Sequence, residues 1–137
     1  MKSLIITAVA GAALLSAGPA SAVDAAQIEA RYTPAFGQCL DTPDGQTTAG
    51  TIGCIAVELK IQDAALNAAY RSLTAGMNAR QQAGLRDAQR AWIAFRDADC
   101  ASRHDWEWGS MSTVAANFCV LRRTVERTIE LETFGPE

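Results

Sequence analysis

The sequence predicts an all-α fold: an antiparallel three-helix bundle that follows an N-terminal loop segment and is stapled by two disulfides. Apolar residues recur at helical spacing in three segments after residue 50, and no segment alternates with the period of a β-strand. The chain holds four cysteines downstream of a segment typical of export signals. Removal of that signal leaves enough chain for one domain with one core.

Residues 1–22 are predicted to be a secretory signal peptide. Lys2 supplies a positive start, an apolar stretch follows, and Ala20-Ser21-Ala22 is a small-residue cleavage site. A membrane anchor is the alternative, but the apolar stretch is shorter than the about 20 residues that cross a bilayer. We therefore expect a periplasmic or secreted protein with no membrane span after signal removal.

Charge excludes one class of partner. Cleavage after residue 22 removes one of the 12 basic residues and none of the 15 acidic ones, which leaves a net charge of −4. A mildly acidic domain lacks the basic patch that nucleic acid requires, so we expect no nucleic-acid binding. The charge suits a cationic protein partner, although it is also ordinary for a soluble domain.

Residues 23–50 are expected to form an N-terminal lead. A helical turn fits residues 24–31, and Thr33-Pro34 and Pro43-Asp44-Gly45 are turn sequences. Cys39 lies inside this lead. A disulfide would explain how so long a loop is held in place.

The helical domain is predicted over residues 51–135. The first helix covers about 51–75, with Thr51 as a cap and Gly76 as its stop. The second follows Asn78, which forms a capping-box pattern with Gln81. The third begins after Ser110 or Ser112 and ends at Gly135-Pro136. Short links favour antiparallel neighbours.

The apolar stripes define the expected core, with Trp92 as its anchor because a buried aromatic dominates a small core. Beside it, we expect either a solvated charged face or a polar network, and we favour the network of Asn67, Gln89, Arg96 and Arg127. The predicted core residues are Leu66, Tyr70, Leu85, Trp92, Phe95, Phe118 and Leu121.

Cys39, Cys54, Cys100 and Cys119 are predicted to form two disulfides, since an even count in a small exported chain is typical of them. A zinc site is disfavoured because the chain has no C-x-x-C pair and a single histidine. Antiparallel helices bring the last three cysteines to one end, which Cys39 can reach. Of three possible pairings, this placement favours Cys39–Cys54 with Cys100–Cys119.

The sequence offers little for catalysis. His104 has no second histidine to work with, and no nucleophile elbow, phosphate loop or H-E-x-x-H pattern occurs. We therefore predict no enzyme, no cofactor and no metal, with a hydrolase as the least favoured alternative.

The link over residues 103–112 is the expected partner-binding element. Its tryptophans are of the type enriched at binding hot spots, although one of them folding over the core is an alternative. Four acids crowd the end of the preceding helix, where carboxylates oppose the macrodipole: Asp97, Asp99, Asp105 and Glu107. They mark either a functional surface or acids that nearby arginines neutralise. The candidate contact residues are His104, Asp105, Trp106, Glu107, Trp108 and Ser110.

Four segments together resemble a known family. They are Asp63-x-x-Leu66-Asn67-x-x-Tyr70-x-x-Leu73, the stretch LRDAQRAWIAFRDADC at 85–100, Gly109-Ser110-Met111, and Cys119-x-x-x-x-Thr124-x-x-Arg127-Thr128-x-x-Leu131. The chain resembles the LprI-type lysozyme-inhibitor domain over about residues 39–131, with Cys39 and Cys54 in the usual positions of the first two cysteines. It departs where Trp108 replaces a glycine and in the Gly/Thr-rich stretch between Cys39 and Cys54.

The resemblance implies a helical exported protein whose family activity is lysozyme inhibition. Lysozyme is a basic protein whose cleft works with two carboxylates, so an acidic and rigid protein can be steered to it and block the cleft sterically. The alternative function is an envelope interaction module that binds another protein or a cell-wall component.

Overall fold

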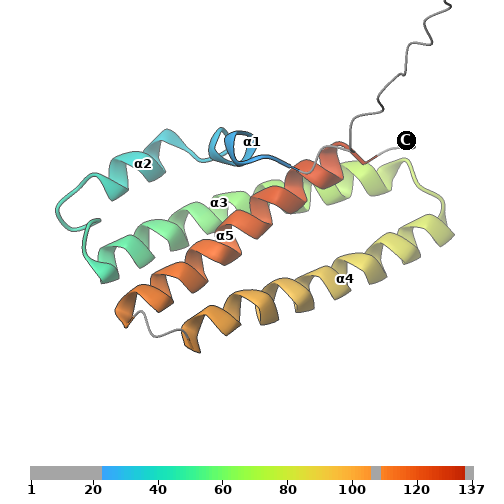
Figure 1. Cartoon of the computed structure of the whole chain (residues 1–137). Helices are drawn as coiled ribbons and strands as arrows, with labels where there is room; N and C mark the ends of the chain where they lie inside the picture. The colour runs from blue at the N-terminus through green and yellow to red at the C-terminus, as the bar shows by residue number, and fades with distance from the viewer. Residues whose placement is uncertain (1–22, 106–108, 135–137) are drawn as a thin grey trace, which may run out of the picture.

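The computed structural model describes residues 23–105 and 109–134, and every regular element in these ranges is helical. This confirms the all-α prediction. Three long helices account for most of the chain, preceded by two short ones (Figure 1). The elements are α1 (Ala25–Glu29), α2 (Pro34–Leu40), α3 (Thr48–Ala75), α4 (Ala79–Ala101), the 3₁₀ turn η1 (Ser102–Asp105) and α5 (Ser110–Glu132).

The central pair of the fold is α3 with α5, which lie along each other and make the most extensive helix–helix contact (Figure 1). Helix α4 follows α3 and precedes α5 in the chain, runs in the opposite direction to both, and lies on the other side of α5 from α1 and α2 (Figure 1). Only Leu85 and Cys100 of α4 are fully buried, so most of this helix keeps one side in contact with water.

Two of the three helix starts differ from expectation. Helix α3 begins at Thr48, three residues early, because the Thr47 hydroxyl caps it by accepting from the Gly50 amide. Helix α5 is preceded by Gly109 and has no side-chain cap, since the Ser112 hydroxyl donates to the Gly109 carbonyl instead. The capping box of Asn78 with Gln81 is confirmed. The expected stop at residues 135–136 lies outside the described residues.

The N-terminal lead is more ordered than a loop. Asp24 caps α1 in a box with Gln27, and Thr33 caps α2. Farther along, a Cβ on Gly45 would collide with the carbonyl oxygen of Cys39, so this buried position requires glycine. Close packing of backbone therefore explains part of the glycine-rich composition between the first two cysteines.

A buried carboxylate fastens the lead to α3. Glu58 is 1% exposed, and its oxygens accept from the Thr33 amide at 2.9 Å and the Thr33 hydroxyl at 2.6 Å. Gln62 donates from Nε2 both to Glu58, at 2.7 Å, and to the Arg31 carbonyl, at 2.8 Å. These bonds satisfy polar groups of the lead that packing removes from water.

The favoured disulfide pairing is right. Cys39–Cys54 joins α2 to α3 with 5.8 Å between the Cα atoms, and Cys100–Cys119 joins α4 to α5 with 5.5 Å. The first bridge secures the lead to the start of α3. The second secures the end of α4 to α5.

The predicted core is partly wrong. Leu66, Leu85 and Leu121 are buried, and Tyr70 and Trp92 are half-buried against the cluster that contains Leu66 and Leu85. Phe95 is 57% exposed and Phe118 is 38% exposed, so neither is a core residue. Helical spacing places them on an apolar stripe, but no neighbouring helix that the structure describes covers the face of α4 that carries Phe95.

In the described part of the chain, no helix is both long and apolar enough to cross a membrane.

Candidate partner-binding surface

The α4–α5 link and the α2–α3 turn lie at the same end of the molecule (Figure 1). The Thr48 and Ser110 hydroxyl oxygens are 3.5 Å apart, which joins the starts of α3 and α5. Asp41 and Asp44 are exposed in the α2–α3 turn. We call this region the link end: the α4–α5 link with the α2–α3 turn beside it.

Of the six predicted contact residues, the structure places His104 and Ser110 at the link end, and both are exposed. Asp105 closes the η1 turn with its backbone. Its side chain and residues 106–108 lie outside the described residues. The role of the two tryptophans and of Glu107 therefore stays a prediction.

Gly109 sets how the link enters α5. Its φ of 57° lies in the left-handed region, where any side chain would add strain. The chain therefore enters α5 through a backbone conformation at Gly109 that glycine adopts more easily than any other residue. This gives a physical reason for the Gly-Ser step that the sequence shares with its family.

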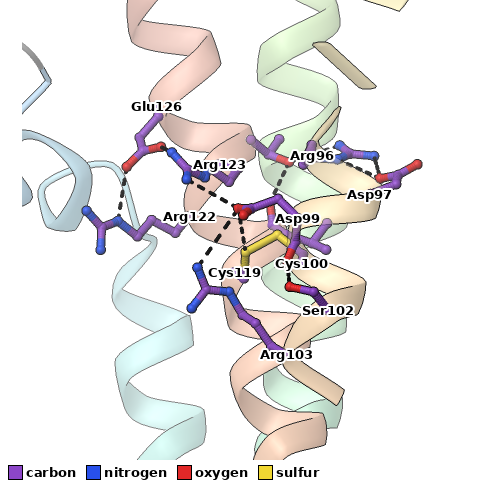
Figure 2. Close-up of a disulfide and its surroundings, with 12 residues drawn as sticks. Arg96, Asp97, Asp99, Cys100, Ser102, Arg103, Cys119, Arg122, Arg123 and Glu126 are labelled. Atoms are coloured by element: carbon purple, nitrogen blue, oxygen red, sulfur yellow. Dashed lines mark hydrogen bonds and ion pairs between the residues drawn. A yellow bond between two sulfur atoms is a disulfide. The ribbon is translucent and has the colours of Figure 1, made fainter. Parts of the chain in front are cut away.

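The acids at the end of α4 are paired (Figure 2). The Asp99 carboxylate lies 3.3 Å from the Arg123 guanidinium and 3.9 Å from that of Arg103, beside the Cys100–Cys119 bridge. Asp97 lies 2.8 Å from Arg96. Of the two interpretations offered by the sequence, the geometry supports neutralisation by nearby arginines for Asp97 and Asp99.

The charge cluster continues along α5 to residues that the sequence analysis missed. Glu126 accepts from Arg122 at 3.0 Å and from Arg123 at 3.1 Å. Burial lowers the pKa of Arg123, but its bonds to Glu126 and Asp99 outweigh that effect and raise the pKa overall. The R-R-x-x-E spacing, typical of helical ion pairs, was the signal for this cluster.

A hollow of about 290 Å³ opens beside the cluster, lined by Arg103, Phe118 and Arg122 among others. Asp99 and the two adjacent sulfurs are close enough together to resemble a ligand set. Those sulfurs are bonded to each other, so no thiolate is present to bind a metal.

A second hollow of about 340 Å³ lies between α3 and α4. The expected polar network forms only in part at its edge. Arg127 donates to Gln89 at 3.0 Å, and the guanidinium of Arg96 lies 5.2 Å from the centre of the Trp92 ring. Asn67 instead donates to the Asp63 carbonyl of its own helix, at 2.9 Å.

These features agree with the comparison to known families. The family described as Lysozyme inhibitor LprI matches residues 39–131, which span both disulfides and all three long helices. The chain belongs to this family. The family is named for inhibition, which is a binding and not a catalytic activity, and two disulfides are typical of proteins that fold outside the cytoplasm.

Two relatives extend the comparison. An uncharacterized protein of Rhizobium meliloti (strain 1021) is 33% identical over 93 residues, which cover 58% of this chain and 67% of the relative. A crystal structure of an uncharacterized protein from Burkholderia thailandensis superposes with a TM-score of 0.59 at 27% identity, over 77% of this chain. This chain spans about half (51%) of that solved chain.

Proposed function

We propose that this protein is an exported, periplasmic or secreted inhibitor of lysozyme that blocks the enzyme's cleft sterically. Membership of the LprI family over residues 39–131 carries the proposal. No chemistry by the inhibitor is needed, because a rigid body seated in the cleft excludes the glycan. Signal cleavage after residue 22 is part of the proposal.

The link end is the proposed contact surface. The Cys100–Cys119 bridge and the Asp99–Arg103 pair hold one side of the link, and the Thr48–Ser110 contact holds the other. An element whose ends are already fixed loses less entropy on binding than a flexible one. The six proposed contact residues are His104, Asp105, Trp106, Glu107, Trp108 and Ser110.

Charge supports the orientation of the complex. Asp97 and Asp99 are paired, so the acids available to a cationic enzyme at the link end are Asp41 and Asp44 of the turn and those of the link itself. Residues 23–47 carry four acids and one arginine, a net charge of −3. Long-range attraction of this kind mainly raises the association rate.

The direct test is lysis of a bacterial suspension by lysozyme, followed by turbidity, with the purified oxidised protein present. The double variant Glu107→Ala, Trp108→Ala is expected to weaken inhibition by about 30-fold or more, the effect of losing a hot spot of ~2 kcal/mol. The matched control is Glu29→Ala, Phe134→Ala, which removes an exposed acid and an exposed aromatic elsewhere.

Equal inhibition by the link variant and the wild type would remove the link from the contact. Absence of inhibition by folded wild-type protein would reject the function and leave the envelope interaction module. Added salt is expected to slow association more than it speeds dissociation, because it screens steering over about 10 Å at 0.1 M.

A further inference from the structure

The hollow between α3 and α4 is lined mainly by polar and charged side chains of those two helices, and the α4–α5 link does not contribute to it. We call it the α3–α4 groove and define it by Asp63, Asn67, Tyr70, Arg86, Gln89 and Arg90. Its volume of about 340 Å³ lies within the range of small-ligand pockets. The groove is lined from two of the four segments that carry the family resemblance.

Two arginines of the groove make no strong ion pair within the described residues. Within the described residues, Arg90 makes no ion pair. Arg86 approaches only Asp87, at 4.0 Å, and both side chains are more than half exposed, so that pair contributes little. By contrast, Arg96 is engaged with Asp97 and with the Trp92 ring. Arg86 and Arg90 are therefore available to a ligand.

The surrounding charge is positive although the protein as a whole is acidic. Residues 79–96 of α4 contain four arginines and one aspartate, a net charge of +3, whereas the whole chain carries −3. Helix α4 lies on the side away from the acidic lead (Figure 1). Since Arg86 and Arg90 are one helical turn apart, about 6 Å along the axis, they can approach one anionic group together.

The remaining polar side chains of the groove can form hydrogen bonds with the hydroxyl and amide groups of a ligand. The Asp63 carboxylate makes no ion pair within the described part of the chain and can accept from a ligand's O–H or N–H. Gln89 uses its oxygen for Arg127 and retains its NH₂ to donate. The Tyr70 hydroxyl makes no hydrogen bond among the described residues and can donate or accept.

We propose that the α3–α4 groove binds an acidic saccharide, with Arg86 and Arg90 on its carboxylate and Asp63, Gln89 and Tyr70 on its hydroxyl and amide groups. Arginine recognises a carboxylate through paired N–H donors. A purely anionic ligand leaves Asp63 without a donor, whereas a sugar supplies several. Leu66 and Ile93, which also line the groove, can cover the apolar edge of a sugar ring.

The test compares two disaccharides by nuclear magnetic resonance titration of the purified oxidised protein. N-acetylglucosaminyl-N-acetylmuramic acid carries a carboxylate that chitobiose lacks, and the two are otherwise closely similar. Binding of the acidic disaccharide is expected to be at least tenfold tighter, with shifts at Arg86, Arg90 and Tyr70. Equal affinity, no saturable binding, or shifts confined to the link end would overturn the proposal.

Two double variants distinguish binding at the groove from a general effect of the protein's charge. Arg86→Gln, Arg90→Gln is expected to weaken binding of the acidic disaccharide at least tenfold. The control Arg71→Gln, Arg80→Gln makes the same charge change at exposed positions of α3 and α4 outside the groove, and should alter binding less than twofold. A tetraglutamate peptide that binds the groove as tightly as the sugar would overturn the saccharide assignment.

This inference is independent of lysozyme inhibition. Inhibition measured with a soluble chitooligosaccharide substrate, which has no carboxylate, should be unchanged by Arg86→Gln, Arg90→Gln. Loss of inhibition in that variant would mean that the groove contacts the enzyme, and would overturn its assignment as a separate saccharide site. Failure of the wild type to inhibit lysozyme would leave the disaccharide titration fully interpretable.

Discussion

Replacing Glu58 with alanine tests how the N-terminal lead is held to the helical pair. The change removes the common acceptor of the Thr33 amide, the Thr33 hydroxyl and Gln62 Nε2 in a site that is 1% exposed. A buried donor that loses its partner costs about 1–3 kcal/mol. The three donors share one carboxylate, so their losses do not simply add.

We therefore expect Glu58→Ala to lower the free energy of unfolding by about 3–4 kcal/mol. Urea unfolding followed by far-ultraviolet circular dichroism measures this change, and hydrogen exchange should show earlier loss of protection at the Thr33 amide. Glu58→Gln, which retains one acceptor oxygen and the side-chain shape, is expected to cost less. The exposed Lys60→Ala should change stability by less than about 0.5 kcal/mol.

A Glu58→Ala protein within about 1 kcal/mol of the wild type, with Thr33 still protected, would refute the reasoning. It would mean that the lead is held by the Cys39–Cys54 bridge and apolar packing alone. A loss as large for Lys60→Ala would show that the effect belongs to α3 in general and not to the buried carboxylate.

Three further predictions concern stability. Replacing Cys100 and Cys119 by serine should lower the free energy of unfolding by about 3 kcal/mol in urea, since the bridge closes a loop of 19 residues; an unchanged midpoint would contradict this. Trp92→Ala should cost about 2–4 kcal/mol because the ring is half-buried, whereas the exposed Phe95→Ala should cost less than about 1 kcal/mol; equal losses in melting experiments would be inconsistent with the observed packing. Burial raises the pKa of Tyr32 to about 12 from 10.0, so between these pH values the unfolded chain releases a proton that the folded one keeps. Stability should therefore fall over pH 10–12, and less steeply in Tyr32→Phe; identical urea midpoints for both proteins across that range would exclude the effect.

The sequence alone determined the helical class, and among three possible pairings of the cysteines it favoured the one observed. Helical periodicity and the Asn78–Gln81 capping box are local signals, and local signals survive in the folded chain when no neighbour opposes them. The preference for that pairing came from antiparallel connection, because short links leave adjacent helix ends side by side. Family membership was also readable from motifs in the chain.

Only the tertiary structure decided which apolar stripes are covered. Phe95 occupies a stripe position on α4 as regular as that of Leu85, yet one is exposed and the other buried. Spacing defines a face of a helix, but the neighbour's position decides how much of that face is removed from water. The Glu58 network and the α3–α4 groove join residues from different helices, so they exist only once those helices are packed.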